Sequence, residues 1–223
     1  MSQIKVELID SSGGDISVVN SARVSFGKSV EDMDTKDVNL IRYLAKHEHM
    51  TPFRHNFVQL RCSVPLFLAR QIGKHQAGLT WNEESRRYID EVPEFYRPEQ
   101  WRKRPDKSIK QGSGDGVVEY VDFGFKHLDP EPINFVYADL VNDNVACYKA
   151  MLKAGVAPEM ARMVLPQSMM VNFIWSGNLL AFHHVYKLRA GEGAQQEAVE
   201  FANLLKEAIE PAFPISWEAL EAR

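Results

Sequence analysis

The sequence predicts an α+β protein in which a mixed or antiparallel sheet is flanked by helices within a single domain, residues 1–223. Two short segments, residues 4–9 and 55–64, alternate apolar and polar side chains in the manner of half-buried strands. Longer segments, such as residues 37–48, instead repeat apolar residues at helical spacing. With 223 residues, 45% of them apolar, the chain is long enough to bury one core.

The first part of the chain is expected to alternate strands with helices. Gly13 and Gly14 make a turn after the first strand, and Asp15 is expected to cap the helix that follows. Pro52 ends the next helical pattern, whereas Pro65 opens another because proline suits a first helical turn. The helices expected in this part cover residues 17–26, 37–48 and 66–75.

Residues 90–116 differ from the rest because prolines and glycines are scattered among charged and aromatic residues. This composition predicts a long surface loop. After it, Pro130 and Pro132 are expected to separate two helices within residues 117–154. The remaining expected elements are helices at 157–165, 178–188 and 193–210 and a strand at 168–175.

Composition and charge argue against several classes of partner. The formal net charge is -4 and the pI is near 6.0, whereas proteins that coat nucleic acids usually carry a basic excess, so no nucleic-acid polymer is expected. No apolar run approaches the roughly 20 residues of a membrane span, and no apolar signal segment opens the sequence. Cys62 and Cys147 would allow one disulfide, but two reduced, buried cysteines in a cytoplasmic protein are the simpler interpretation.

The densest polar segment is residues 70–88, which combine arginine, lysine and histidine with serine, glutamine, asparagine and glutamate. Arginine fits phosphate oxygens bidentately, and a carboxylate can accept hydrogen bonds from a sugar or a ring N–H. No GxxxxGK[ST] or GxGxxG motif occurs. On residue chemistry alone two interpretations stay open: nucleotide binding without a glycine-rich phosphate loop, or a polar loop with scattered ion pairs.

The same segment resembles the signature of flavin-dependent thymidylate synthases, which carry Arg-Gln, then Arg-His-Arg, and then Asn-Glu-x-Ser-x-Arg-Tyr. The matching letters here are Arg70-Gln71, Lys74-His75-Gln76 and NEESRRY at residues 82–88. Other blocks agree with the family in order and spacing over about residues 1–220. They are SARVSF (21–26), HEHMTPFRH (47–55), EMARMVLP (159–166) and NLLAFHHVYKLRAGEGAQQE (178–197).

The resemblance implies an FAD-dependent methyltransferase that makes dTMP from dUMP, with NADPH and methylene-tetrahydrofolate as co-substrates. It also implies a homotetramer whose sites combine residues from several subunits. The family needs no enzymic cysteine to activate the pyrimidine, which agrees with both cysteines lying outside the motif.

The resemblance also assigns the nucleotide side of the site. The residues expected to bind dUMP are Gln71, Glu83, Ser85, Arg87, Arg162 and Arg189, with Ser85 and Arg189 in the catalytic set. Arg189 would face the pyrimidine, where its permanent charge can stabilise negative charge developing on the ring oxygens. For the pair Glu159 and Arg162 the alternative is a surface ion pair on one helix face.

The flavin side is assigned in the same way. The residues expected to contact the flavin are Ser25, His49, Thr51, Lys74, His75, Gln76, Asn178 and His184. A metal site at the alternating His47 and His49 is disfavoured, because no acidic or thiol ligand has convincing spacing. Since His183 and His184 are adjacent on an expected helix, only one of them can face a given site.

The sequence departs from the family pattern on the flavin side. Cations of the family are replaced by Gln76 and Leu180, the loop before Asn82 is one residue longer, and Arg54 stands where the family has glutamate. We expect Arg54 to restore part of the lost positive field. Two alternatives follow from the altered pocket: a relative that makes a C5-hydroxymethyl pyrimidine nucleotide, from uracil or cytosine, and a non-catalytic nucleotide or flavin binder. A histidine-based metal hydrolase is a more distant rival.

Overall fold

The computed structural model describes residues 3–106, 112–125 and 129–223. Its centre is an antiparallel four-stranded sheet in the order β1-β2-β6-β3. The strands are β1 (Lys5–Ser12), β2 (Phe57–Pro65), β3 (Leu79–Glu83) and β6 (Met170–Gly177). Helices flank this sheet, so the predicted α+β class is confirmed. Strand β3 was not expected, because its five residues belong to the polar motif rather than to an apolar alternation.

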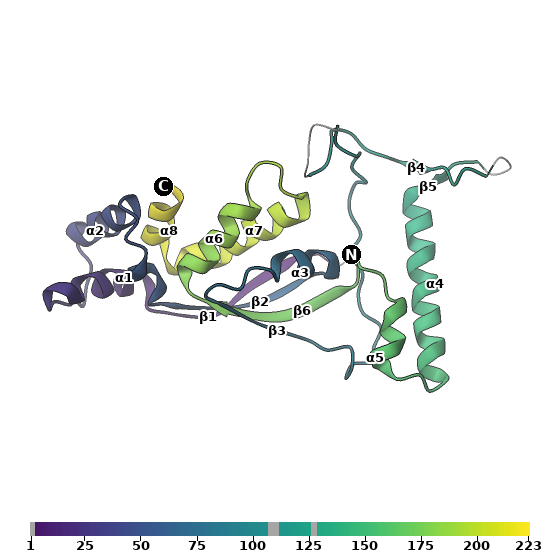
Figure 1. Cartoon of the computed structure of the whole chain (residues 1–223), viewed down its shortest axis with the longest axis horizontal. Helices are drawn as coiled ribbons and strands as arrows, with labels where there is room; N and C mark the ends of the chain where they lie inside the picture. The colour runs from purple at the N-terminus through teal and green to yellow at the C-terminus, as the bar shows by residue number, and fades with distance from the viewer. Residues whose placement is uncertain (1–2, 107–111, 126–128) are drawn as a thin grey trace.

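One face of the sheet is buried and the other is polar, as strand alternation requires. In β2 the buried positions Val58, Leu60 and Cys62 alternate with Gln59 and Arg61 on the other face. The buried face packs against α3 (Leu66–Ile72), α6 (Leu179–Arg189) and α7 (Gln196–Ile209), which lie on the same side of the sheet in Figure 1. The core therefore forms one layer between the sheet and these helices.

A second group of helices lies at one end of the sheet (Figure 1). It comprises α1 (Gly14–Arg23), η1 (Val24–Phe26), α2 (Thr35–Lys46), η2 (Thr51–Arg54), η4 (Glu210–Ala212) and α8 (Pro214–Glu221). The expectation that Asp15 caps the first helix is wrong, because Asp15 lies inside α1 and is buried. Its carboxylate instead accepts the main-chain N–H groups of Ile215 and Ser216, at 3.0 and 2.8 Å, in the first turn of α8. Helix α8 itself was not expected.

The opposite end of the molecule carries an arm made of α4 (Ile133–Lys153), α5 (Pro158–Ala161) and the 3-10 helix η3 (Arg162–Val164). The expectation of two helices within residues 117–154 is wrong, because among its described residues only α4 is helical. The segment before α4 forms the two-residue strands β4 (Tyr120–Val121) and β5 (Glu131–Pro132), while residues 126–128 lie outside the described residues. The helix expected at 157–165 is divided between α5 and η3.

Residues 90–116 contain only isolated bridges in their described part, Phe95 to Met169 and Arg102 to Val117. Residues 107–111 of this expected loop lie outside the described residues. Within the described ranges no helix is long and apolar enough to cross a membrane.

Candidate active site

The polar residues of the 82–88 motif gather around a cavity of about 750 Å³ at the end of β3, which we call the β3 cavity. Helix α3 and η3 contribute further walls, and residues 165–171 line the remainder. Four of the residues expected to bind the nucleotide line this cavity: Glu83, Ser85, Arg87 and Arg162. They come from two segments more than 70 residues apart in sequence, and the packing of η3 near β3 brings them together.

The β3 cavity has an excess of positive charge. Its guanidinium groups belong to Arg70, Arg86, Arg87 and Arg162. They are opposed by the carboxylates of Glu83 and Glu84, so the lining carries an excess of two positive charges. Burial raises the pKa of the Glu83 carboxyl; the 3.2 Å hydrogen bond from the indole N–H of Trp81 opposes this shift, and the charge of Glu84 adds to it. The cavity is thus suited to an anion rather than to a neutral ligand.

The loop after β3 holds Arg87 in position before any ligand binds. The Ser85 hydroxyl accepts a hydrogen bond from Arg87 Nε at 3.0 Å, and the Arg87 guanidinium lies over the ring of Tyr88 at 5.0 Å from its centroid. Arg162 Nε donates to the main-chain oxygen of Glu159 at 3.1 Å, so these two residues do not form the side-chain ion pair considered from their spacing. Both guanidiniums keep further N–H donors for a ligand.

Arg86 and Arg70 were not assigned to the site by sequence. Arg86 is only 8% exposed; it donates to the main-chain oxygen of Glu91 and lies 3.8 Å from the Glu84 carboxylate. Glu84 in turn accepts a 2.9 Å hydrogen bond from the side-chain amide of Asn172 in β6. This network ties the motif loop to the sheet. The sequence carried a signal for both: Arg70 stands in the Arg-Gln pair of the motif, and Arg86 stands at a position that the motif leaves open.

A separate cluster forms where the end of α6 meets α3. Arg189 Nε donates to His75 Nε2 at 3.0 Å, and Arg189 Nη2 donates to the main-chain oxygen of Gln71 at 3.2 Å. His75 therefore accepts through Nε2 and is neutral. Burial and, second, the Arg189 charge lower the pKa of His75, while burial also lowers the pKa of Arg189. Gln71 lies beside this cluster, and its side-chain oxygen is buried without a partner among the described residues.

The residues expected to contact a flavin lie in four places. Ser25, His49 and Thr51 line a pocket of about 800 Å³ among the helices at one end of the sheet. Lys74 and Gln76 line a hollow of about 540 Å³ that shares Arg70 and Glu83 with the β3 cavity. His75 belongs to the Arg189 cluster, and the last two residues, Asn178 and His184, belong to α6.

In α6 the side chains divide between structural and outward-facing roles. Asn178 is the N-cap, and its side-chain oxygen accepts the main-chain N–H of Ala181 at 3.0 Å. His183 is buried against Trp217, whereas His184 is exposed, so the two adjacent histidines face different environments as expected. Burial, followed by the charges of Arg223 and then Arg54, lowers the pKa of His184.

Leu180 stands at the position of a family cation. Its side chain is 2% exposed and packs in the core, so it does not face the flavin-side surfaces. Besides burial, the cations whose charges lower the pKa of His184 are Arg223, Arg54 and Lys187. Whether Arg54 compensates for a lost cation stays a prediction.

The sequence profile described as "Thymidylate synthase complementing protein" matches residues 7–215. The chain belongs to this family. Its relatives include the flavin-dependent thymidylate synthases of Thermus thermophilus, 35% identical over 97% of this chain and 75% of the relative, and of Thermosipho africanus, 37% identical over 91% and 86%.

Two solved structures share the fold of this chain. A UMP/dUMP methylase from Streptomyces cacaoi bound with 5-Br dUMP superimposes with a TM-score of 0.81 at 27% identity, covering 99% of this chain and 96% of that one. The same enzyme bound with 5-Br UMP gives a TM-score of 0.82 at 29% identity, covering 100% and 95%. The similarity therefore extends over the whole chain.

The donor chemistry of this family member fits a flavin cofactor. Hydroxyls, imidazoles and cations line the surfaces named above, and these groups suit the hydroxyls and the anionic pyrophosphate of FAD. The donors nevertheless lie on separate surfaces of one chain: Ser25, His49 and Thr51 are at one end of the sheet, and the β3 cavity is near the arm at the other (Figure 1).

Neither cysteine lines the cavities described above. Cys62 is buried in the core, and burial raises the pKa of its thiol. The expectation that Cys147 is buried is wrong, because it lies exposed on α4. The described residues contain no cluster of three or more His, Cys, Asp or Glu side chains suited to a metal ion.

Proposed function

We propose that this protein transfers a one-carbon unit from methylene-tetrahydrofolate to C5 of dUMP in a flavin-dependent reaction that yields dTMP. The observation that carries the proposal is the β3 cavity, where the family motif places Ser85, Arg87 and Arg162 around one space. Family membership and the names of the relatives support the same reaction.

The phosphate of dUMP binds in the β3 cavity. A phosphate monoester carries a charge of about -1.5 to -2 at pH 7, which the excess of two positive charges in the lining matches. Arg87 and Arg162 donate to its oxygens, and Ser85 keeps the Arg87 side chain oriented for that contact. Binding through fixed guanidinium groups also orients the sugar and the base relative to α3 and α6.

Arg189 acts on the pyrimidine. Its hydrogen bonds to His75 and to the Gln71 main chain fix the guanidinium plane, so little reorganisation is needed when negative charge develops on the ring oxygens. This electrostatic stabilisation makes C5 nucleophilic without a covalent enzyme adduct. The buried, weakly acidic thiol of Cys62 is consistent with such a mechanism.

The flavin supplies hydride chemistry when it is bound, with NADPH as the reductant. We assign its contacts to Ser25, His49, Thr51, Lys74, His75, Gln76 and His184, with Asn178 positioned beside them as the cap of α6. In this assignment the neutral His75 links the flavin side to Arg189.

We also propose that the active enzyme is a homotetramer with shared sites. Ser25, His49 and Thr51 lie at the opposite end of the sheet from the β3 cavity of the same chain, so chains packed against one another are needed to bring these flavin-side residues to the nucleotide. The arm supports this assembly, since Phe135 and Leu140 of α4 and Met163 of η3 are 70%, 57% and 70% exposed. Such large apolar groups commonly mark protein interfaces when they gather on one surface.

The function is tested by incubating the protein with FAD, NADPH, methylene-tetrahydrofolate and dUMP and measuring the nucleotide product by mass spectrometry. A mass gain of about 14 Da, one methylene unit, supports the proposal. A gain of about 30 Da would instead indicate a hydroxymethyl product, and an unchanged nucleotide, with dCMP as well as dUMP, would contradict transfer to a pyrimidine. Methylation adds CH2, about 14 Da, and hydroxymethylation adds CH2O, about 30 Da, to the nucleotide.

Binding experiments test the nucleotide site separately. Arg87→Ala should weaken dUMP about 10- to 100-fold, the loss expected for a charge-assisted hydrogen bond, while deoxyuridine, which lacks the phosphate, should bind equally to both proteins. Arg42→Ala is the matched control, because Arg42 forms an exposed ion pair with Glu218 on the helices α2 and α8. Equal weakening of dUMP and deoxyuridine would contradict the phosphate assignment.

A further inference from the structure

A second hollow, which we call the Trp101 pocket, lies between α3, the start of α4 and the 95–102 segment. Its volume is about 410 Å³, within the usual range for small-molecule sites. The aromatic residues that line it are Phe67, Tyr96, Trp101 and Tyr137. None of these four was assigned to a nucleotide or flavin site from the sequence.

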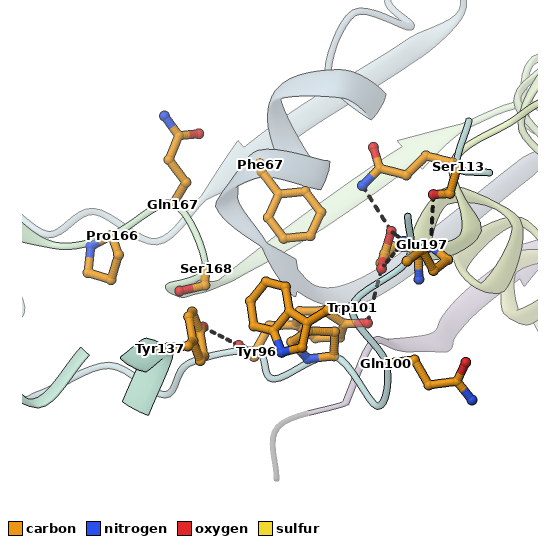
Figure 2. A pocket seen from close by; sticks show the side chains of 13 residues that line it. Phe67, Tyr96, Gln100, Trp101, Ser113, Tyr137, Pro166, Gln167, Ser168 and Glu197 are labelled. Carbon is orange, nitrogen blue, oxygen red and sulfur yellow. Dashed lines mark hydrogen bonds and ion pairs between the residues drawn. The ribbon is translucent and has the colours of Figure 1, made fainter. Parts of the chain in front are cut away.

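The aromatic rings form the walls of the pocket. Figure 2 shows Phe67 above Trp101 and Tyr96, with Tyr137 and Ser168 toward one end and Glu197 toward the other. Phe67 meets Tyr96 edge to face at 6.0 Å, and Trp101 meets Tyr137 edge to face at 5.2 Å between ring centroids. The Trp101 indole N–H is held by the side-chain oxygen of Asn134 at 2.7 Å, so the ring has a fixed orientation.

The polar end of the pocket is electrically neutral. Arg102 Nη2 donates to both carboxylate oxygens of Glu197 at 2.7 and 2.8 Å, and the Gln195 amide donates to the same carboxylate at 2.9 Å. Burial acts to raise the pKa of Glu197, but the hydrogen bonds from Arg102 and Gln195 together with the Arg102 charge outweigh it, so the pKa is lowered. Arg102 Nε also donates to the Ser113 hydroxyl at 2.9 Å, so this end has little unpaired charge to offer an anion.

Among the described residues that line the pocket, one buried side-chain polar atom lacks a protein partner. The hydroxyl oxygen of Ser168 is buried, and no described residue hydrogen-bonds to it. The side chains of Gln100 and Gln167 also line the pocket and carry amides that can both donate and accept. A buried hydroxyl without a partner costs free energy unless a ligand or water satisfies it.

We propose that the Trp101 pocket is a second ligand site that binds an uncharged heteroaromatic ring of nucleobase size. Aromatic walls bind such rings by stacking, and an edge that carries both donors and acceptors pairs with a hydroxyl and with amides. The paired Arg102 and Glu197 exclude a phosphate group, because neither charge is left to bind one. This chemistry is the opposite of that of the β3 cavity, whose lining selects an anion.

The Trp101 pocket adjoins the β3 cavity. Gln167 lines both spaces, and the consecutive residues Leu66 and Phe67 face the β3 cavity and the Trp101 pocket respectively. A ligand that orders this shared wall changes nucleotide affinity, and linkage requires the nucleotide to change the affinity of that ligand by the same factor. The second site therefore has a route to influence the first.

Calorimetry with two uncharged nucleosides, adenosine and thymidine, tests the proposal. The protein is first saturated with dUMP and FAD, so that binding at their sites does not contribute to the heat. We expect at least one of these probes to bind once per chain and to quench tryptophan fluorescence. Inorganic phosphate should do neither.

Two variants locate the binding. Trp101→Phe keeps an aromatic face and should retain the calorimetric binding while losing the fluorescence change. Trp101→Leu keeps apolar volume but removes the stacking surface, and should weaken the probe about tenfold or more. Trp217→Phe is the control, since Trp217 packs against His183 among the helices at the other end of the sheet. Retained thermal unfolding and dUMP affinity show that each variant is folded.

Three results would overturn the proposal. The first is that neither nucleoside binds to the saturated protein. The second is that Trp101→Leu binds the probe as tightly as the unmodified protein does. The third is that Trp101→Leu changes the oligomeric state in size-exclusion chromatography, because another chain would then cover the pocket. Failure of dUMP itself to bind would instead count against the proposed function, and in that case the same titration with FAD alone still decides the second site.

Discussion

Replacing Arg189 tests the electrostatic part of the mechanism directly. Arginine has five N–H donors, and His75 and the Gln71 main chain use two of them among the described contacts. The other donors are available to the pyrimidine. Arg189→Gln removes the charge, whereas Arg189→Lys keeps the charge but cannot make the same planar pair of hydrogen bonds.

The expected loss of kcat follows from removing a fixed hydrogen-bond donor that faces negative charge developing in the transition state. Removing one such donor typically lowers kcat by about 10²- to 10³-fold, equivalent to about 2.7–4 kcal/mol. We expect Arg189→Gln to fall in this range and Arg189→Lys to lose about tenfold less. Because we assign the phosphate to the β3 cavity rather than to Arg189, we expect the Kd for dUMP to change by less than about tenfold in either variant.

Two measurements are needed. Single-turnover formation of dTMP at saturating dUMP reports the chemical step, and calorimetry reports dUMP binding. NMR titration of His75 provides a readout besides activity: burial is the larger cause of its lowered pKa and the Arg189 charge the second, so Arg189→Gln should raise the His75 pKa part of the way toward its ordinary value.

The reasoning would be refuted by a loss that appears in dUMP affinity with kcat unchanged, since that pattern means equal contact in ground and transition states. An unchanged His75 pKa in Arg189→Gln would contradict the contact between the two side chains.

Three further predictions concern stability. Asp15→Ala should lower the free energy of unfolding by about 2–4 kcal/mol in urea titrations, because the N–H groups of Ile215 and Ser216 lose their acceptor. Asp15→Asn should lower it less. A change below about 0.5 kcal/mol in Asp15→Ala would refute the proposed role of Asp15 in capping α8. Burial lowers the pKa of His183 to about 4, so between pH 6.5 and 4 the unfolded chain binds a proton that the native protein does not. The contribution of neutral His183 to the free energy of unfolding is thus fully present above about pH 6.5, and about 3 kcal/mol is lost as the pH falls through the folded pKa. His183→Phe should remove this part of the pH dependence of stability. An identical pH dependence in the variant would count against the role of His183. Leu180→Arg, which restores the family's cation, should cost about 4 kcal/mol or more in chemical denaturation, because the new charge is buried, while Leu180→Met should cost less than about 1.5. A stable Leu180→Arg protein with tighter flavin binding would contradict the core placement.

The spacing of apolar residues along the chain predicted the strands and helices that are set by neighbouring residues. The alternation in β2 and the helical spacing in α2 and α7 are properties of neighbouring residues, and each is present in the structure near its expected position. The family motif likewise identified a short segment whose residues line one cavity, because Glu83, Ser85 and Arg87 are held together by the chain itself.

Long-range contacts decided the features that were mispredicted or missed. Asp15 has the composition of a helix cap, but its partners in α8 lie 200 residues later, and only packing shows which helix it caps. Strand β3 carries a polar sequence and becomes a strand because it pairs with β6. Leu180 occupies the position of a family cation, yet the orientation of α6 turns it into the core.

The sequence alone therefore determined the class of fold and the family, since both are written in residue order and spacing. Only the tertiary structure decided that the cavity also contains Arg70 and Arg86, that Arg189 is fixed by His75, and that the flavin-side residues lie on separate surfaces. The physical reason is that charge balance, hydrogen-bond partners and burial depend on distances between segments, which residue order does not specify.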